Sequence, residues 1–104
     1  MKICIDEVLQ WSNGNRAVLE ESEFCGCYNC ISIFSIEELR KCDFDGYSYE
    51  GSDTGVCPYC LSSGTLLPNK SPFPLEREVL EEIGYEVLGE YGEVWYARNH
   101  KNRI

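Results

Sequence analysis

Basic residues are scarce in this chain of 104 residues, and their scarcity bears on its possible partners. Nine lysines and arginines stand against eighteen aspartates and glutamates, which gives a formal net charge of −9 at pH 7. Proteins that bind nucleic acids use clusters of basic residues to displace counterions from the phosphates. The composition therefore disfavours nucleic acid as a partner.

Long hydrophobic runs are also lacking. No segment approaches the ~20 apolar residues of a membrane-spanning helix. The first residues reach Asp6 and Glu7 before any apolar run of signal-peptide length. We therefore expect a cytoplasmic protein without a membrane partner. In the cytosol thiols stay reduced, and closely spaced cysteines hold a metal or do redox chemistry more often than they form disulfides.

Motifs of known enzyme classes are missing as well. The sequence has no G-x-S-x-G motif, no phosphate-binding P-loop and no histidine placed to pair with a cysteine. Its single histidine, His100, lies in a polar tail that we interpret as a solvated terminus, and we do not expect it to be a metal ligand. The sequence therefore predicts a protein that is not an enzyme.

Aliphatic side chains are few. The hydrophobic fraction of 43% includes seven cysteines and eleven tyrosines and phenylalanines. A domain of this size has a net stability of about 5–15 kcal/mol. One bound metal ion could therefore decide whether part of the chain folds.

Cysteine, in contrast, is abundant, and four of the seven cysteines form two C-x2-C pairs. Cys27 and Cys30 make the first pair, and Cys57 and Cys60 make the second, 26 residues further on. Two such pairs can supply a tetrahedron of thiolates to one zinc ion, because each pair wraps a tight turn around the metal. Four thiolates leave no open position, so the ion would be structural. Such sites contribute an apparent ~10–16 kcal/mol at neutral pH.

Two other uses of these cysteines stay open. CPYC matches the active-site tetrapeptide of glutaredoxins, but that chemistry needs Cys57 at the start of a helix, where the dipole lowers its pKa. The residues after Cys60, LSSGTLLP, contain Gly64 and Pro68 and do not favour a helix. A set of disulfides would leave one of seven cysteines unpaired.

The remaining cysteines raise a question of ligand identity. Cys25 could replace Cys27, although the spacing from Cys27 to Cys30 is the one that repeats in the second pair. Cys42 is a less favoured ligand. We expect Cys4 and Cys42 to be small buried residues, as free cysteines commonly are.

Local patterns predict a mixed α+β domain over residues 1–104. Asn13-Gly14 suggests two strands or a hairpin within residues 1–23. Ser35 and Glu38 form a capping box that predicts a short helix. A second helix is expected over residues 74–83, from Pro74 to a stop at Gly84. We also expect a strand at residues 65–67, a zinc-binding centre over about residues 24–84, and strands within residues 85–104.

The middle of the chain resembles a family of small bacterial cytoplasmic proteins with a zinc-ribbon or treble-clef-like centre. That family reads C-x2-C-x3-F-S-x-E-E-I, then W, then CPYCG, and then a short helix that starts with proline. The matching features here are Phe24, Cys27, Cys30, Phe34, SIEEL at residues 35–39, CPYC at residues 57–60 and PLEREVL at residues 74–80.

The resemblance covers about residues 24–84 and implies that Cys27, Cys30, Cys57 and Cys60 are the metal ligands. The chain departs from the family at Ile31 and Leu61, where a glycine usually follows each cysteine pair. Glycine there eases a backbone turn with positive φ. Cys42 stands where the family has tryptophan. The family has no settled molecular role, so the resemblance leaves the function open.

From these observations we expect a protein-interaction module without enzymatic activity, held together by one structural zinc ion. The identity of its protein partner does not follow from the sequence. One alternative is an acidic immunity or inhibitor protein that masks a basic partner. The less favoured alternative is a thiol-disulfide oxidoreductase that uses CPYC.

Overall fold

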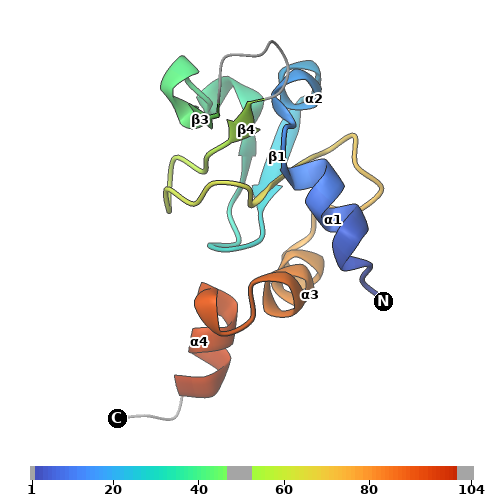
Figure 1. The fold of residues 1–104 in the computed structure, drawn as a ribbon, viewed down its shortest axis with the longest axis vertical. Coiled ribbons are helices and arrows are strands. Elements are labelled where there is room, and N and C mark those ends of the chain that lie inside the picture. Colours follow the sequence, from blue (N-terminus) through green and yellow to red (C-terminus); the bar gives the residue numbers. More distant parts are fainter. Residues whose placement is uncertain (1, 47–52, 101–104) are drawn as a thin grey trace.

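A computed structural model of the chain describes residues 2–46 and 53–100, in which α-helices from both ends of the chain lie beside short strands from its middle (Figure 1). The α-helices are α1 (Ile5–Ser12), α2 (Arg16–Glu21), α3 (Arg77–Leu88) and α4 (Glu93–His100). The strands are β1 (Phe24–Cys27), β2 (Ile33–Ser35), β3 (Phe44–Asp45), β4 (Thr54–Gly55) and β5 (Leu66–Pro68). Three 3-10 turns are η1 (Ile36–Glu38), η2 (Lys41–Asp43) and η3 (Gly89–Tyr91). None of the helices in these residues is long and apolar enough to cross a membrane.

The strands form two small antiparallel sheets. β1 lies in the centre of the larger sheet, whose order is β2-β1-β5. Cys25 is opposite Phe34 of β2 and Pro68 of β5, which fixes the register on both sides. β3 and β4 form the second sheet. The strand predicted at residues 65–67 is confirmed, displaced by one residue.

The two faces of the larger sheet carry different side chains, because successive residues of a strand point to opposite sides. Cys27 of β1 and its neighbour Leu66 of β5 belong to one buried cluster. Gly26 and its neighbour Leu67 lie on the other face, where a Cβ atom added to Gly26 would come within 3.0 Å of Leu80 in α3. The short alternation in CGCY therefore separates a cysteine-rich face from a face covered by helix.

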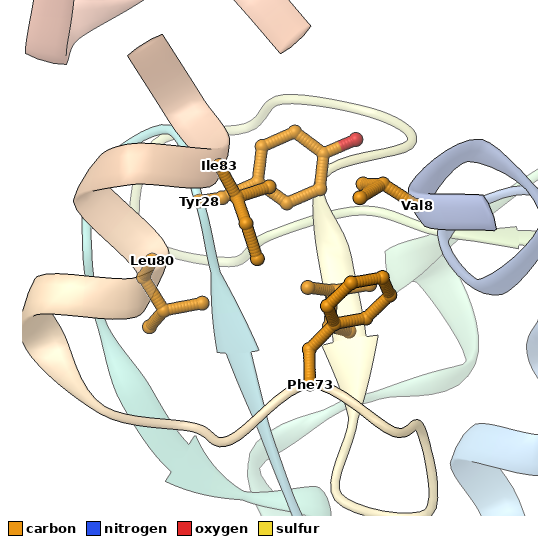
Figure 2. Close-up of a cluster of buried hydrophobic side chains, with 6 residues drawn as sticks. Val8, Tyr28, Phe73, Leu80 and Ile83 are labelled. Carbon is orange, nitrogen blue, oxygen red and sulfur yellow. The ribbon is translucent and has the colours of Figure 1, made fainter. Parts of the chain in front are cut away.

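The helix-covered face holds the larger aliphatic and aromatic core (Figure 2). Val8 from α1 and Leu80 and Ile83 from α3 pack with Tyr28 and Phe73. Fully burying a side chain of this size stabilises the fold by roughly 1.5–3 kcal/mol. The core ties α1 and α3 to the central sheet.

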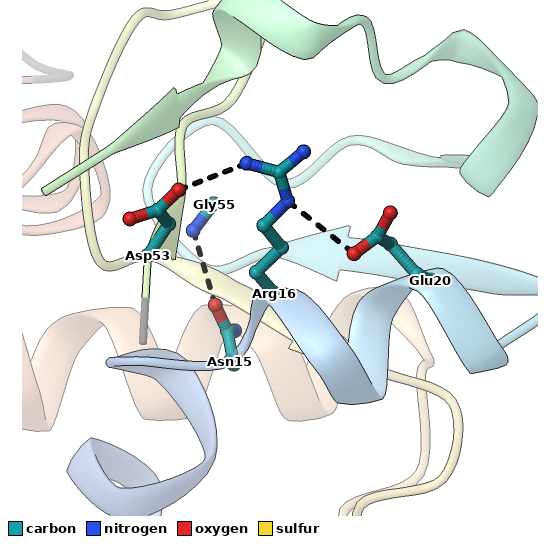
Figure 3. A network of polar contacts seen from close by, with 5 residues as sticks. All are labelled: Asn15, Arg16, Glu20, Asp53 and Gly55. Carbon is teal, nitrogen blue, oxygen red and sulfur yellow. Dashed lines mark hydrogen bonds and ion pairs between the residues drawn. The ribbon is translucent and has the colours of Figure 1, made fainter. Parts of the chain in front are cut away.

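A buried asparagine joins the N-terminal helices to the strands. The side-chain amide of Asn15, just before α2, donates to the carbonyl oxygens of Trp11 and Leu66 at 2.9 and 2.8 Å. Its Oδ1 accepts from the backbone N–H of Gly55 at 3.0 Å (Figure 3). One side chain thus links the two helices to both sheets.

Arg16 strengthens the same junction. Its guanidinium contacts Asp53 at 2.8 Å and Glu20 at 3.3 Å (Figure 3), and it lies 4.6 Å from the centre of the Phe44 ring. The hydrogen bond to Asp53, the largest of several causes, raises the pKa of Arg16. These contacts hold the start of α2 against the smaller sheet.

The strands expected within residues 1–23 were a wrong prediction, because this region forms α1 and α2. An Asn-Gly pair makes a hairpin when strands flank it, whereas here the flanking residues bury one helical face. Val8 and Ser12, four apart, are both buried. Asn13 ends α1, and Gly14 takes a positive φ of 58° to turn the chain toward α2.

The strands expected within residues 85–104 were also wrong over residues 85–100, while residues 101–104 lie outside the described residues. α3 is confirmed as a helix, but it begins at Arg77, runs through Gly84 and ends at Leu88, after which η3 and α4 follow. Gly84 does not stop the helix. It lets α3 approach the backbone, since a Cβ atom there would lie 2.0 Å from the carbonyl oxygen of Tyr28.

The helix expected after Ser35 is shorter than predicted. The chain forms the single turn η1, in which Ser35 Oγ accepts from the backbone N–H of Glu37 at 3.2 Å. Ser35 therefore caps the turn, but the predicted capping box with Glu38 is not formed, because the hydrogen bond comes from Glu37 and the Glu38 carboxylate accepts from the Tyr59 hydroxyl. Leu39 is already extended, with ψ of 126°. One turn is formed instead of an α-helix.

Replacing Gly84 with alanine should destabilise the protein strongly, because its new Cβ atom would meet the Tyr28 backbone. We expect a loss of more than about 2 kcal/mol despite the better helix propensity of alanine, measured by denaturant unfolding. Glu86→Ala, which places alanine at an exposed position two residues further along α3, is the control, and it should change stability by less than about 0.5 kcal/mol. Equal effects in both variants would contradict the close approach of α3.

Candidate metal centre

The structure brings the four predicted cysteines together at one point. The Sγ atoms of Cys27, Cys30, Cys57 and Cys60 all lie within 4.8 Å of one another, so the four could hold a metal ion. Cys27 Sγ lies 3.7 Å from Cys60 Sγ, and Cys30 Sγ lies 3.6 Å from Cys57 Sγ. Zinc–sulfur distances of about 2.3 Å place sulfur atoms about 3.8 Å apart in a tetrahedron. Both measured Sγ–Sγ distances join a cysteine of the first C-x2-C pair to a cysteine of the second, and both are close to that spacing.

Each C-x2-C pair is a tight turn, and the two turns have the same hydrogen bonds. In the first, the N–H of Cys27 donates to Ser32 O at 2.8 Å and the N–H of Ile31 donates to Cys27 O at 2.9 Å. In the second, residues 57, 61 and 62 take the same roles, at 2.9 and 2.8 Å. We call residues 27–32 the first knuckle and residues 57–62 the second knuckle. The repeated spacing therefore produces a repeated backbone shape.

Backbone N–H groups within each knuckle point at its first sulfur atom. The N–H of Asn29 donates to Cys27 Sγ at 3.4 Å, and the N–H of Cys30 also acts to lower the pKa of Cys27. In the second knuckle the backbone N–H groups of Cys60 and Tyr59 likewise act to lower the pKa of Cys57. Donors aimed at a sulfur atom favour its thiolate form, which is the form that binds metals.

Burial works against these donors. It raises the pKa of the Cys27 thiol and raises the pKa of Cys57 to about 11. Burial also acts to raise the pKa of Cys60, but hydrogen bonds, chiefly from Ser62 and Asn29, outweigh it and lower that pKa to about 7. A cation that binds here must therefore displace protons from Cys27 and Cys57.

The residue after each knuckle's second cysteine has a left-handed backbone. Ile31 has a φ of 63° and Leu61 a φ of 62°, the left-handed conformation that glycine adopts most easily. The chain therefore forms this turn without a glycine, at a steric cost of about 1–2 kcal/mol at each position. The two side chains differ in exposure. Ile31 packs against the core of Figure 2, whereas Leu61 is 74% exposed.

The other three cysteines lie outside this group. Cys25 is buried on β1, two residues before Cys27, and burial raises its pKa to about 12. The structure therefore gathers Cys27 into the cluster and leaves Cys25 in the packing beside it. The burial expected for Cys4 and Cys42 was wrong, since both are exposed. Cys4 precedes α1, and Cys42 lies in a turn whose buried side chain is Asp43.

The polar side chains that contact the cysteine sulfur atoms were not predicted from the sequence. Ser32 Oγ lies 3.1 Å from Cys30 Sγ, and Thr65 Oγ1 lies 3.2 Å from Cys27 Sγ. Asn29 Nδ2 donates to Ser62 Oγ at 2.9 Å and to Cys60 Sγ at 3.5 Å. One signal was available, because both knuckles read C-x2-C, then an aliphatic residue, then serine.

Comparisons with known proteins add little to this geometry. No family model matches the chain, and no solved structure was found to match it. The serine/threonine-protein kinase PknG of Mycobacterium leprae (strain TN) is 34% identical to it over 86 residues. The match covers 83% of this chain but 11% of the kinase, so the chain spans a small part of that protein's length.

Replacing Leu61 with glycine should stabilise the protein by about 1 kcal/mol, since it removes the left-handed strain and the exposed side chain packs little. Ile31→Gly is the matched comparison at the equivalent position of the first knuckle. It also loses core packing, so we expect it to destabilise. Thermal unfolding of both variants measures the difference. A destabilised Leu61→Gly variant would contradict the strain at this residue.

Proposed function

We propose that Cys27, Cys30, Cys57 and Cys60 bind one structural zinc ion in a zinc-ribbon or treble-clef-like centre. The observation that carries this proposal is the approach of four sulfur atoms from two knuckles of the same backbone shape. Thiolate ligands favour zinc among the common divalent ions, and a tetrahedron of four thiolates is a usual structural zinc site. The ion would supply the attraction that holds four thiolates together, two of them buried.

We further propose a cytoplasmic protein-interaction module without enzymatic activity. Four thiolates leave zinc no open position for water or a substrate. Exposed aromatic side chains support a binding role, since Tyr91 is 90% exposed and Tyr59 is 59% exposed, and tyrosine is enriched at protein interfaces. The partial similarity to PknG does not extend the proposal to kinase activity.

The net charge of −9 favours a second candidate, an acidic inhibitor that masks a basic protein. Its complex should weaken as salt rises, because electrostatic steering is screened. A thiol-disulfide oxidoreductase is supported less. Cys57 is followed by a turn where that chemistry needs a helix, and its pKa is raised to about 11 where a low value is needed.

Native mass spectrometry of the purified protein should show one zinc ion per chain. Cys27→Ser and Cys57→Ser should each lose the ion and unfold the cysteine-rich face, because a serine hydroxyl cannot replace a thiolate ligand. Cys25→Ser is the matched control, a buried cysteine on the same strand, and it should keep one zinc ion. Circular dichroism before and after a strong chelator measures the loss of structure.

Two results would contradict this proposal. If zinc were lost in Cys25→Ser but kept in Cys27→Ser, the ligand would be Cys25 and the assignment of Cys27 would be wrong. A folded, metal-free protein with a disulfide between Cys57 and Cys60 would favour the oxidoreductase instead.

A further inference from the structure

Asn29 of the first knuckle makes hydrogen bonds toward two separate parts of the molecule. Its side-chain Nδ2 donates to Ser62 Oγ at 2.9 Å and to Cys60 Sγ at 3.5 Å, both in the second knuckle. Its Oδ1 accepts from the backbone N–H of Glu93, the first residue of α4, at 3.1 Å. The donor at Glu93 and the acceptor atoms at residues 60 and 62 together fix the orientation of the amide. One side chain thus joins the cysteine site to the C-terminal helix.

The hydrogen bond from the Glu93 N–H to Asn29 Oδ1 should contribute to the stability of α4. It contains eight residues, fewer than the ~12–15 that make an isolated helix marginally stable in water. The residue before it is Gly92, which has no side chain to cap the helix. Asparagine is among the best residues for accepting from the free N–H groups of a helix start. Asn29 performs this task from a distant segment.

Other contacts also hold α4 in place. Val94 is buried beside Gly84 of α3. Arg98 lies 3.3 Å from Glu82 and 4.7 Å from the centre of the Tyr85 ring, but its ion pair is exposed, and exposed ion pairs contribute little. Trp95 and Tyr96 make further contacts. The hydrogen bond from Glu93 to Asn29 joins the first residue of α4 to the cysteine site.

We propose that Asn29 is a positioning residue that couples metal binding at the four cysteines to the docking of α4. This inference rests on the proposed zinc site. An ion that binds all four sulfur atoms holds the two knuckles together, and Asn29 Nδ2 then keeps its contacts with Cys60 and Ser62. Those contacts aim Oδ1 at Glu93. If the knuckles separate, the amide loses its fixed orientation and α4 loses its cap.

Coupling of this kind acts in both directions, because a binding free energy shared between two sites is reciprocal. Releasing α4 frees Asn29 to rotate, which weakens its donation to Cys60 Sγ. Donors to the ligands of a metal commonly change metal affinity 10- to 100-fold when they are removed. Residue 93 contacts Asn29 through its backbone N–H. Removing that N–H should therefore lower the affinity of the cysteine site for zinc.

The first test compares Asn29→Ala with the wild type, both loaded with zinc. Zinc affinity is measured by competition with a chelator, and docking of α4 by hydrogen–deuterium exchange of residues 94–100. We expect zinc affinity to fall 10- to 100-fold and exchange in α4 to accelerate at least about tenfold. Asn69→Ala is the matched control. It removes an amide that accepts from Glu23 and Phe24 at the far end of β1, and it should change neither readout.

The second test changes α4 without touching the cysteine site. Glu93→Pro removes the N–H that Asn29 accepts from, at the first helical position, where proline is tolerated. Gly92 already has the extended backbone that a following proline requires, with φ of −99° and ψ of 155°. We expect zinc affinity to fall about three- to tenfold relative to Glu93→Ala, which keeps the N–H. This variant provides the test even if Asn29→Ala does not fold.

The outcomes separate the inference from the proposal on which it rests. A wild-type protein that holds no zinc overturns both. Zinc-binding wild type together with an Asn29→Ala variant that changes one readout but not the other overturns the coupling alone, since an ordinary helix cap or an ordinary ligand neighbour would behave in this way. Equal zinc affinities in Glu93→Pro and Glu93→Ala also overturn it.

Discussion

The approach of four cysteine sulfur atoms is the constraint on which the arrangement of this chain depends. The first knuckle connects β1 to β2, and the second lies between β4 and β5, so the site joins the two sheets. Much of the packing on this face comes from buried cysteines rather than aliphatic residues. Burial keeps protons on Cys27 and Cys57, and a cation that replaces them would add bonds to four sulfur atoms on this cysteine-rich face.

The energies explain how the knuckles tolerate an unfavourable backbone. Ile31 and Leu61 each have a left-handed conformation that costs about 1–2 kcal/mol in a residue with a side chain. A structural zinc ion contributes an apparent ~10–16 kcal/mol, several times the sum of both costs. Two short hydrogen bonds also close each knuckle. With zinc bound, the turn would be fixed by its backbone and its sulfur atoms, and the residue after the second cysteine need not be glycine.

The helices on the opposite face are joined to the cysteine site by close backbone approaches. Gly26 lets Leu80 of α3 rest on β1, and Gly84 lets α3 lie against the carbonyl oxygen of Tyr28 in the first knuckle. Asn29, the next residue, reaches the start of α4. The first knuckle therefore contacts both C-terminal helices, and this is the physical basis for coupling between the metal centre and that end of the described chain.

The sequence by itself determined the features that local geometry controls. The spacing C-x2-C repeats a turn that closes within six residues, so the four cysteines could be predicted as one cluster. The proline-led apolar pattern likewise predicted α3. Long-range packing, in contrast, decides that the N-terminal region forms α1 and α2, that Gly84 lies inside α3, and that Cys27 joins the cluster while Cys25 packs beside it. Each of these features depends on a partner far away in the chain, such as the Tyr28 carbonyl oxygen that excludes a side chain at residue 84. A local sequence pattern does not indicate where such a distant partner will lie.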